Sequence, residues 1–188
     1  MDPSITAQVA TITKRLNTAV DVKPLPRVLV SDSDAYTVAS LPGGWVVVSA
    51  KMVTLLGANP DALAGILAHE YAHVEDNDAL KQMTGAMGAD TMVSLTIQGK
   101  YTEASNVAVQ LMNFSHNMDD EEKADREGVR IASSAGYDPK GILTAINTLE
   151  AVTPLSDAQW LAVHPVNAKR LRMLAGDVAV YAADQQKK

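Results

Sequence analysis

Apolar residues recur along this chain at helical spacing in some stretches and at strand spacing in others. The first helical stretch runs from residue 5 to residue 20, and Pro24 and Pro26 end it. Its apolar positions, which share one face, are Ile5, Val9, Ile12 and Leu16. We expect this N-terminal helix, within residues 1–22, to pack on the rest of the molecule.

Three short stretches after this helix are predicted to be β-strands. They are Arg27–Ser31, Tyr36–Leu41 and Trp45–Ser49. The second and the third flank Pro42-Gly43-Gly44, a sequence typical of the turn of a β-hairpin. The pattern therefore predicts a small three-stranded sheet.

The next helix carries strong start signals. Asn59 is a favourable N-cap, Pro60 suits the first helical position, and the carboxylate of Asp61 complements the positive end of the helix. Leucine and histidine side chains then project from different sides of it. The core positions are Leu63, Leu67 and Val74, and the other side carries His69 and His73.

Helical patterns account for most of the remaining chain. The predicted helices are residues 79–98, 101–114, 119–136, 138–151 and 167–182, with a loop through Pro154 and His164-Pro165 before the last one. Five methionines between Met83 and Met118 are interpreted as core filling, with a binding groove as the alternative. The predicted fold class is α+β: a single, mainly helical domain over residues 1–188 with a small sheet.

Composition excludes several classes of protein. Apolar residues make up 47% of the 188 residues, enough for a sizeable core. The net charge of −6 argues against a nucleic-acid partner, which usually requires a basic face. No apolar run approaches the roughly 18 residues of a transmembrane helix, so none is predicted. The oligomeric state is left open.

The chain has no cysteine, which leaves histidine and carboxylate as its strong metal ligands. It also excludes disulfides and thiol catalysis. The N-terminal residues show no signal peptide, but an exported protein whose signal had been removed would look the same. We expect a periplasmic or otherwise exported protein, with a cytoplasmic location as the alternative.

The sequence His69-Glu70-Tyr71-Ala72-His73 combines two metal ligands with a general base. Positions i and i+4 lie one above the other on a helix, so both imidazoles can reach one ion. Glu70 lies about 100° around the helix axis, where it can hold a water beside the metal. The alternative is an exposed helix with two surface histidines.

A catalytic zinc site takes three protein ligands and leaves one position for water. Glu121 is our candidate for the third ligand, and Asp125, four residues later, is placed to accept a hydrogen bond from a ligand imidazole. The alternative is that these acidic residues form a solvated helix start, favoured by the helix dipole. The predicted cofactor is Zn²⁺.

Five motifs in this order resemble the gluzincin zinc peptidases that include the CAAX prenyl proteases, HtpX and soluble periplasmic relatives. The motifs are Leu41-Pro42-Gly43-Gly44, Leu67-Ala68-His69-Glu70-Tyr71-Ala72-His73, Glu121-x-x-Ala124-Asp125-Arg126, Ala135-Gly136-Tyr137-Asp138-Pro139 and His164-Pro165. The resemblance covers roughly residues 25–175 and implies a zincin-like metallopeptidase fold.

The resemblance also implies roles for individual residues. Glu121 would be the third zinc ligand, and the strand at the Pro-Gly-Gly turn would pair with an extended polypeptide substrate. His164 would stabilise the oxyanion or occupy the fourth zinc position as a latch, although its spacing alone also fits a surface loop. Arg170 matches a basic residue that would pair with a carboxylate near the site.

The chain departs from the family pattern at two places. Thr37-Val38-Ala39 stands where Asn-Ala-Phe is common, and Asp78 stands where a histidine often follows the second ligand. Neither change affects a ligand or the base, but both leave the substrate preference undetermined. The transmembrane helices of the prenyl proteases and HtpX are not seen, so we expect no buried chamber for a prenyl peptide.

The sequence therefore predicts a zinc-dependent endopeptidase that acts on unfolded or damaged polypeptides, as in protein quality control. Glu70 would take a proton from the attacking water and pass it to the leaving amine. The competing hypothesis is a latched or non-catalytic zinc-bound module that acts as a chaperone or binding partner. A purely structural helical protein would leave the order of the motifs unexplained.

Overall fold

The computed structural model describes residues 2–87, 116–152 and 154–186. Its sheet contains β1 (Arg27–Ser31), β2 (Val38–Leu41) and β3 (Trp45–Ser49), in the order β1-β3-β2. β1 is parallel to β3, and β2 is antiparallel to it, as the predicted hairpin requires. The predicted strand at Tyr36 begins too early. The Tyr36 N–H donates to the carbonyl of Asp157, and its own carbonyl accepts from the N–H of Trp160.

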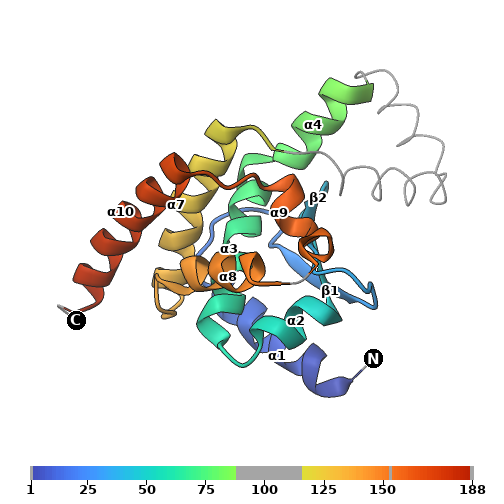
Figure 1. Ribbon diagram of the computed structural model, residues 1–188, viewed down its shortest axis with the longest axis horizontal. Helices are drawn as coiled ribbons and strands as arrows, with labels where there is room; N and C mark the ends of the chain where they lie inside the picture. The colour runs from blue at the N-terminus through green and yellow to red at the C-terminus, as the bar shows by residue number, and fades with distance from the viewer. Residues whose placement is uncertain (1, 88–115, 153, 187–188) are drawn as a thin grey trace.

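Helix α3 (Pro60–Asp76) lies at the centre of the molecule (Figure 1). It begins where the sequence predicts, and the Asn59 side chain accepts hydrogen bonds from the backbone of Asp61 and Ala62. Every residue from Ala62 to Val74 is buried. The helix is therefore enclosed on all sides, because helices cover the side that carries the histidines as well as the core side.

Three further helices pack on α3, namely α1 (Pro3–Leu16), α7 (Met118–Ser134) and α8 (Gly141–Glu150), and α10 (Ala168–Gln185) packs on α7 (Figure 1). α1 ends four residues before the predicted limit, and α8 begins three residues after the predicted one, because Asp138 caps a turn by accepting from the N–H of Lys140. α7 packs closely on α3 at Gly128. A Cβ atom at this glycine would lie 2.9 Å from the Cα of His69.

Several short helices were not predicted. α2 (Ala50–Leu56) follows β3 directly, and the stretch predicted as a loop before His164 contains η1 (Leu155–Asp157) and α9 (Gln159–Val163). Such short elements show too few turns for a helical period to be recognised. α4 (Asp78–Met87) covers the start of the predicted helix 79–98. The rest of that helix, the predicted helix 101–114 and two of the five methionines, Met92 and Met112, lie outside the described residues.

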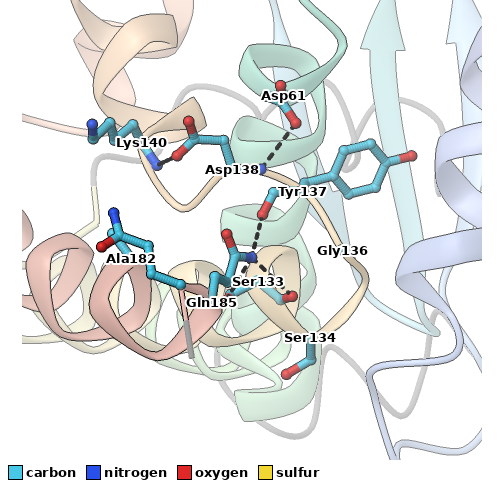
Figure 2. A pocket seen from close by; sticks show the side chains of 10 residues that line it. Asp61, Ser133, Ser134, Gly136, Tyr137, Asp138, Lys140, Ala182 and Gln185 are labelled. Atoms are coloured by element: carbon cyan, nitrogen blue, oxygen red, sulfur yellow. Dashed lines mark hydrogen bonds between the residues drawn. The ribbon is translucent and has the colours of Figure 1, made fainter. Parts of the chain in front are cut away.

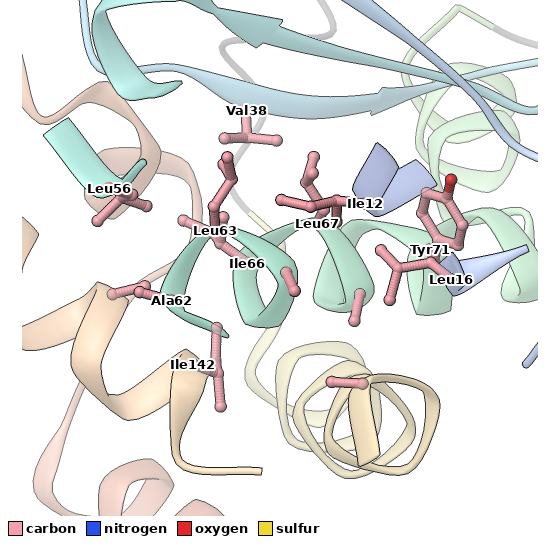
Figure 3. Packing of buried hydrophobic residues seen from close by; sticks show 14 of the residues in the cluster. Ile12, Leu16, Val38, Leu56, Ala62, Leu63, Ile66, Leu67, Tyr71 and Ile142 are labelled. Atoms are coloured by element: carbon pink, nitrogen blue, oxygen red, sulfur yellow. The ribbon is translucent and has the colours of Figure 1, made fainter. Parts of the chain in front are cut away.

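The core lies between α3, the sheet, α1 and α8 (Figure 3). Leu63 and Leu67 of α3 face Val38 of β2, while Leu16 of α1 packs near Tyr71. Of the four apolar positions predicted to share one face of α1, Val9, Ile12 and Leu16 are buried and Ile5 is partly buried. Among the described residues, no helix is long and apolar enough to cross a membrane. The predicted fold class, a mainly helical α+β fold with a three-stranded sheet, is confirmed.

Candidate active site

Three of the chain's four histidines and one glutamate meet beside the centre of α3. His69 and His73 come from α3, Glu121 comes from the first turn of α7, and His164 follows α9. One nitrogen or oxygen atom of each residue lies within 4.8 Å of those of the other three, and all four side chains are buried. The sequence separates these residues by up to 95 positions, and the fold brings them together.

The distances between these four groups are short and similar. His69 Nε2 lies 3.1 Å from His73 Nε2 and 3.2 Å from His164 Nδ1. Glu121 Oε1 lies 2.8 Å from His164 Nδ1 and 3.4 Å from His73 Nε2, and its Oε2 lies 3.6 Å from His69 Nε2. Histidine nitrogen and carboxylate oxygen are groups that divalent metals take as ligands. The cluster could therefore hold a metal ion.

The far nitrogens of the two α3 histidines face carboxylates. His69 Nδ1 lies 3.0 Å from Asp125 Oδ1, and His73 Nδ1 lies 2.9 Å from Asp78 Oδ2. Carboxylates in this position fix the orientation of a ligand imidazole. Asp78 is thus part of the site, although in the sequence it stands out only as a departure from the family pattern.

Arg170 is fully buried and binds two acidic residues of α7, Glu121 and Asp125. Its Nε and Nη2 donate to the two carboxylate oxygens of Asp125 at 2.7 and 2.8 Å, and it also forms an ion pair with Glu121. A third contact runs from Nη1 to the carbonyl of Pro165 at 3.1 Å. The arginine therefore connects α7 to the segment that carries His164.

Glu70 points into the same site and has three partners. Its Oε2 accepts from the backbone N–H of Ser40 at 2.8 Å, and its Oε1 accepts from the indole Nε1–H of Trp160 at 2.8 Å. His164 Nε2 lies 3.2 Å from Oε1. These contacts hold the Glu70 carboxylate beside the cluster of His69, His73, Glu121 and His164. Glu70 itself is not one of the four residues of that cluster.

Burial and charge act on the pKa values in opposite directions. Burial alone would raise the pKa of Glu70 and of Glu121, but the nearby His164 and the two α3 histidines outweigh it, so both pKa values lie well below the ordinary range. Burial would lower the pKa of His73, yet its contacts with Asp78 and Glu121 raise it to about 10. Both glutamates are therefore ionised at neutral pH.

An open polar pocket lies elsewhere on the molecule (Figure 2). It has a volume of about 720 Å³ and includes Asp61, at the opposite end of α3 from His73. Its groups bind one another: Gln185 donates to the carbonyl of Tyr137 at 2.9 Å, and the N–H of Asp138 donates to Asp61 at 2.9 Å. The side chains that could bind a metal ion lie at the buried cluster instead, with Glu70 beside them.

Comparison with known proteins identifies the family. The model described as "Peptidase family M48" matches residues 3–178. The chain belongs to peptidase family M48. This M48 chain thus belongs to a family of metallopeptidases, and the resemblance to HtpX-type peptidases seen in the sequence is confirmed.

Three relatives show how far the likeness extends. The chain is similar to the "Protease HtpX homolog" of Salinibacter ruber (strain DSM 13855 / M31), with 29% identity over 153 residues, which cover 72% of this chain and 53% of the relative. It is similar to the "Protease HtpX homolog" of Polynucleobacter necessarius subsp. necessarius (strain STIR1), with 25% identity, covering 79% of this chain and 57% of the relative. It is also similar to the "Beta-barrel assembly-enhancing protease" of Escherichia coli (strain K12), with 24% identity over 90% of this chain and 38% of the relative. This M48 chain therefore spans between 38% and 57% of the length of these three relatives.

The fold brings together every residue that the sequence singled out for the site. Those residues are His69, Glu70, His73, Glu121, Asp125, His164 and Arg170. Sequence reasoning missed Asp78, Trp160 and the N–H of Ser40. An acidic residue five positions after His73 was a visible signal for Asp78, whereas a backbone N–H leaves no signal in the sequence.

Proposed function

We propose that this chain is a zinc-dependent endopeptidase in which His69, His73 and Glu121 hold the metal. The observation that carries the proposal is the buried cluster with the carboxylate of Glu70 held directly beside it by Ser40 and Trp160. Ligand atoms about 2.0–2.1 Å from a tetrahedral zinc ion lie roughly 3.3 Å apart. The distances among the three proposed ligands, 3.1, 3.4 and 3.6 Å, lie close to this value.

The residues around the cluster suit peptide hydrolysis. Zinc, when bound, lowers the pKa of a coordinated water to about 7 and polarises a carbonyl group. Glu70 is ionised and accepts the proton of the attacking water, then donates it to the leaving amine. Ser40 and Trp160 hold the two carboxylate oxygens during this transfer, and Asp125 and Asp78 orient the two imidazoles.

The position of His164 supports a role as a latch at the fourth ligand position of the zinc ion, rather than a role in stabilising the oxyanion. Its Nδ1 lies 3.2 Å from His69 Nε2 and 2.8 Å from Glu121 Oε1, as a fourth ligand of the same ion would. Water needs that fourth position, so His164 must move away before hydrolysis. We therefore propose that the structure represents a resting state, and that His164 controls the entry of water.

An extended polypeptide is the proposed substrate. β2 is an edge strand, and the Ser40 N–H points away from β3 toward Glu70. Along a strand of an antiparallel pair, backbone groups that point outward alternate with those paired to the neighbouring strand. The backbone groups of Val38 therefore point to the same side as the Ser40 N–H. A substrate strand added there would lie beside Glu70. Because strand addition requires an extended backbone, unfolded or damaged polypeptides are the expected class of substrate, as in protein quality control. We also propose an exported location.

The test combines a general protease substrate with one substitution. Purified protein with bound zinc should cleave casein, and a chelator should abolish the cleavage. Glu70→Gln should bind zinc normally but reduce kcat by about 10²- to 10⁴-fold, because the base is lost while the ligands remain. Full activity of this variant would refute the assigned base.

A second candidate function rests on the position of His164. A permanently occupied fourth ligand position would leave a zinc-bound module that binds polypeptides without cleaving them. Protein with stoichiometric zinc that prevents the aggregation of an unfolded substrate, yet never cleaves it, would support this alternative.

A further inference from the structure

The imidazole of His164 lies between two other aromatic rings. The indole of Trp160 stacks on it with a centroid distance of 4.6 Å and an interplanar angle of 17°. The ring of His116 also stacks on it, at 4.7 Å and 20°. Two rings that are both nearly parallel to a third at such distances must cover its opposite faces. His164 is therefore enclosed between Trp160 and His116.

The Trp160 face of this arrangement is fixed by the core. Trp160 is fully buried, and its indole Nε1–H donates to Glu70 at 2.8 Å. Its backbone N–H donates to the carbonyl of Tyr36. Because its backbone, its indole N–H and its packing all hold Trp160 in place, His164 cannot move out on that side.

His116 covers the opposite face and is anchored to the segment that carries His164. Its backbone N–H donates to the carbonyl of Val163 at 2.9 Å. Its Nδ1 lies 2.7 Å from Nε2 of Gln82 in α4, and its ring stacks on His73 at 4.1 Å. Unlike Trp160, His116 is partly exposed. The exit route of His164 therefore lies on the side of His116.

We propose that His116 is a positioning residue that holds His164 against Trp160 and so keeps its Nδ1 at the metal position. This inference rests on the proposed function of the same site, because it concerns the residue that must leave before hydrolysis. A stacked aromatic pair contributes enough to change a conformational ratio by about 2- to 12-fold. Loss of the His116 ring should raise the fraction of molecules with His164 released by that factor.

Chemical labelling of His164 tests the proposal without requiring activity. Diethyl pyrocarbonate modifies accessible imidazoles, and the rate for His164, followed by mass spectrometry of the zinc-loaded protein, reports its released fraction. His116→Ala should raise this rate by about 2- to 12-fold, and His116→Leu, which fills the same space without an aromatic face, should do so as well. His116→Phe keeps a stacking ring and should keep the slow rate.

His69 provides the internal control, since it is fully buried and its ring contacts among the described residues are with His73, Trp160 and His164. Its labelling rate should stay unchanged in all three variants. An unchanged rate for His164 in both His116→Ala and His116→Leu would overturn the proposal. A parallel rise at His69 would also overturn it, because general loosening rather than release of one ring would then explain the result.

Casein cleavage separates this inference from the proposed function. If His164 labelling responds as expected but the unsubstituted protein cleaves nothing, His116 is a positioning residue and the peptidase assignment fails. If the protein shows Glu70-dependent cleavage but His164 labelling does not respond, only the role of His116 is wrong. If both hold, kcat should rise by a similar factor in His116→Ala.

Discussion

Single residues show where sequence reasoning is strong. The helical spacing predicts that the rings of His69 and His73 lie on one side of α3, and the need of a zinc site for a third ligand predicts Glu121 beside them. The fold brings these three side chains together, and their role as zinc ligands stays a prediction. The partners of Glu70 could not be recognised in this way. Trp160 is separated from it by 90 positions, and no local spacing rule connects them.

Asp125 is predicted to affect metal affinity and stability together. Its carboxylate lies 3.0 Å from His69 Nδ1 and accepts two hydrogen bonds from the buried Arg170. Asp125→Asn keeps the shape but removes the charge, which takes from the buried arginine the carboxylate that accepts two of its hydrogen bonds and leaves Glu121 as its ion-pair partner. We expect zinc affinity to fall by about 10- to 100-fold and the free energy of unfolding to fall by about 3–5 kcal/mol. Chelator competition and thermal unfolding measure the two effects.

A surface ion pair supplies the control for this prediction. Asp76 pairs with the exposed Lys123 at the end of α3. Asp76→Asn should change the free energy of unfolding by no more than about 1 kcal/mol, because exposed pairs contribute little, and should leave zinc affinity unchanged. Equal effects of the two substitutions would show that Asp125 has no special role.

At the scale of elements, start signals and hairpin turns were reliable guides. Asn59 and Pro60 fixed the start of α3, and Pro42-Gly43-Gly44 placed the hairpin, because both depend on a few adjacent residues. The short helix α9 depends on tertiary contacts instead, since Trp160 donates hydrogen bonds to the carbonyl of Tyr36, which precedes β2, and to Glu70. Its five residues contain no period from which a helix could be predicted.

The contact between α3 and α7 yields a prediction at this scale. A Cβ atom at Gly128 would lie 2.9 Å from both the backbone nitrogen and the Cα of His69, so Gly128→Ala must push the two helices apart. Glu121 and the α3 histidines would then separate. We expect the free energy of unfolding to fall by about 1–3 kcal/mol and zinc affinity to fall with it.

Gly176 in α10 is the matched control, because it is also helical but, in the described part of the chain, no atom outside the local backbone of its own helix lies within 4 Å of the position of a Cβ. Gly176→Ala should raise the free energy of unfolding by about 0.5–1 kcal/mol through helix propensity alone. Chemical denaturation of both variants measures the difference. If Gly128→Ala were as stable as Gly176→Ala, the close packing would not constrain the site.

On the scale of the whole molecule, the site joins segments that the chain keeps apart. α3 supplies His69 and His73, α7 supplies Glu121, and the segment between α9 and α10 supplies His164. A composition of 47% apolar residues predicted a sizeable core but not this convergence, which depends on how the helices pack around α3. Bound zinc should therefore act as a link among three parts of the fold.

Removal of the metal should lower the stability of the whole molecule. A ligand present at 1,000 times its dissociation constant stabilises the native state by about 4 kcal/mol, which for a chain of this size corresponds to roughly 10 °C in Tm. Scanning calorimetry with and without a chelator should show this fall, and added zinc should reverse it. The triple substitution of His69, His73 and Glu121 by alanine should unfold at one temperature regardless of chelator or zinc. If that variant responded to zinc as the unsubstituted protein does, the stabilising ion would bind elsewhere, and the cluster beside α3 would not be the metal site.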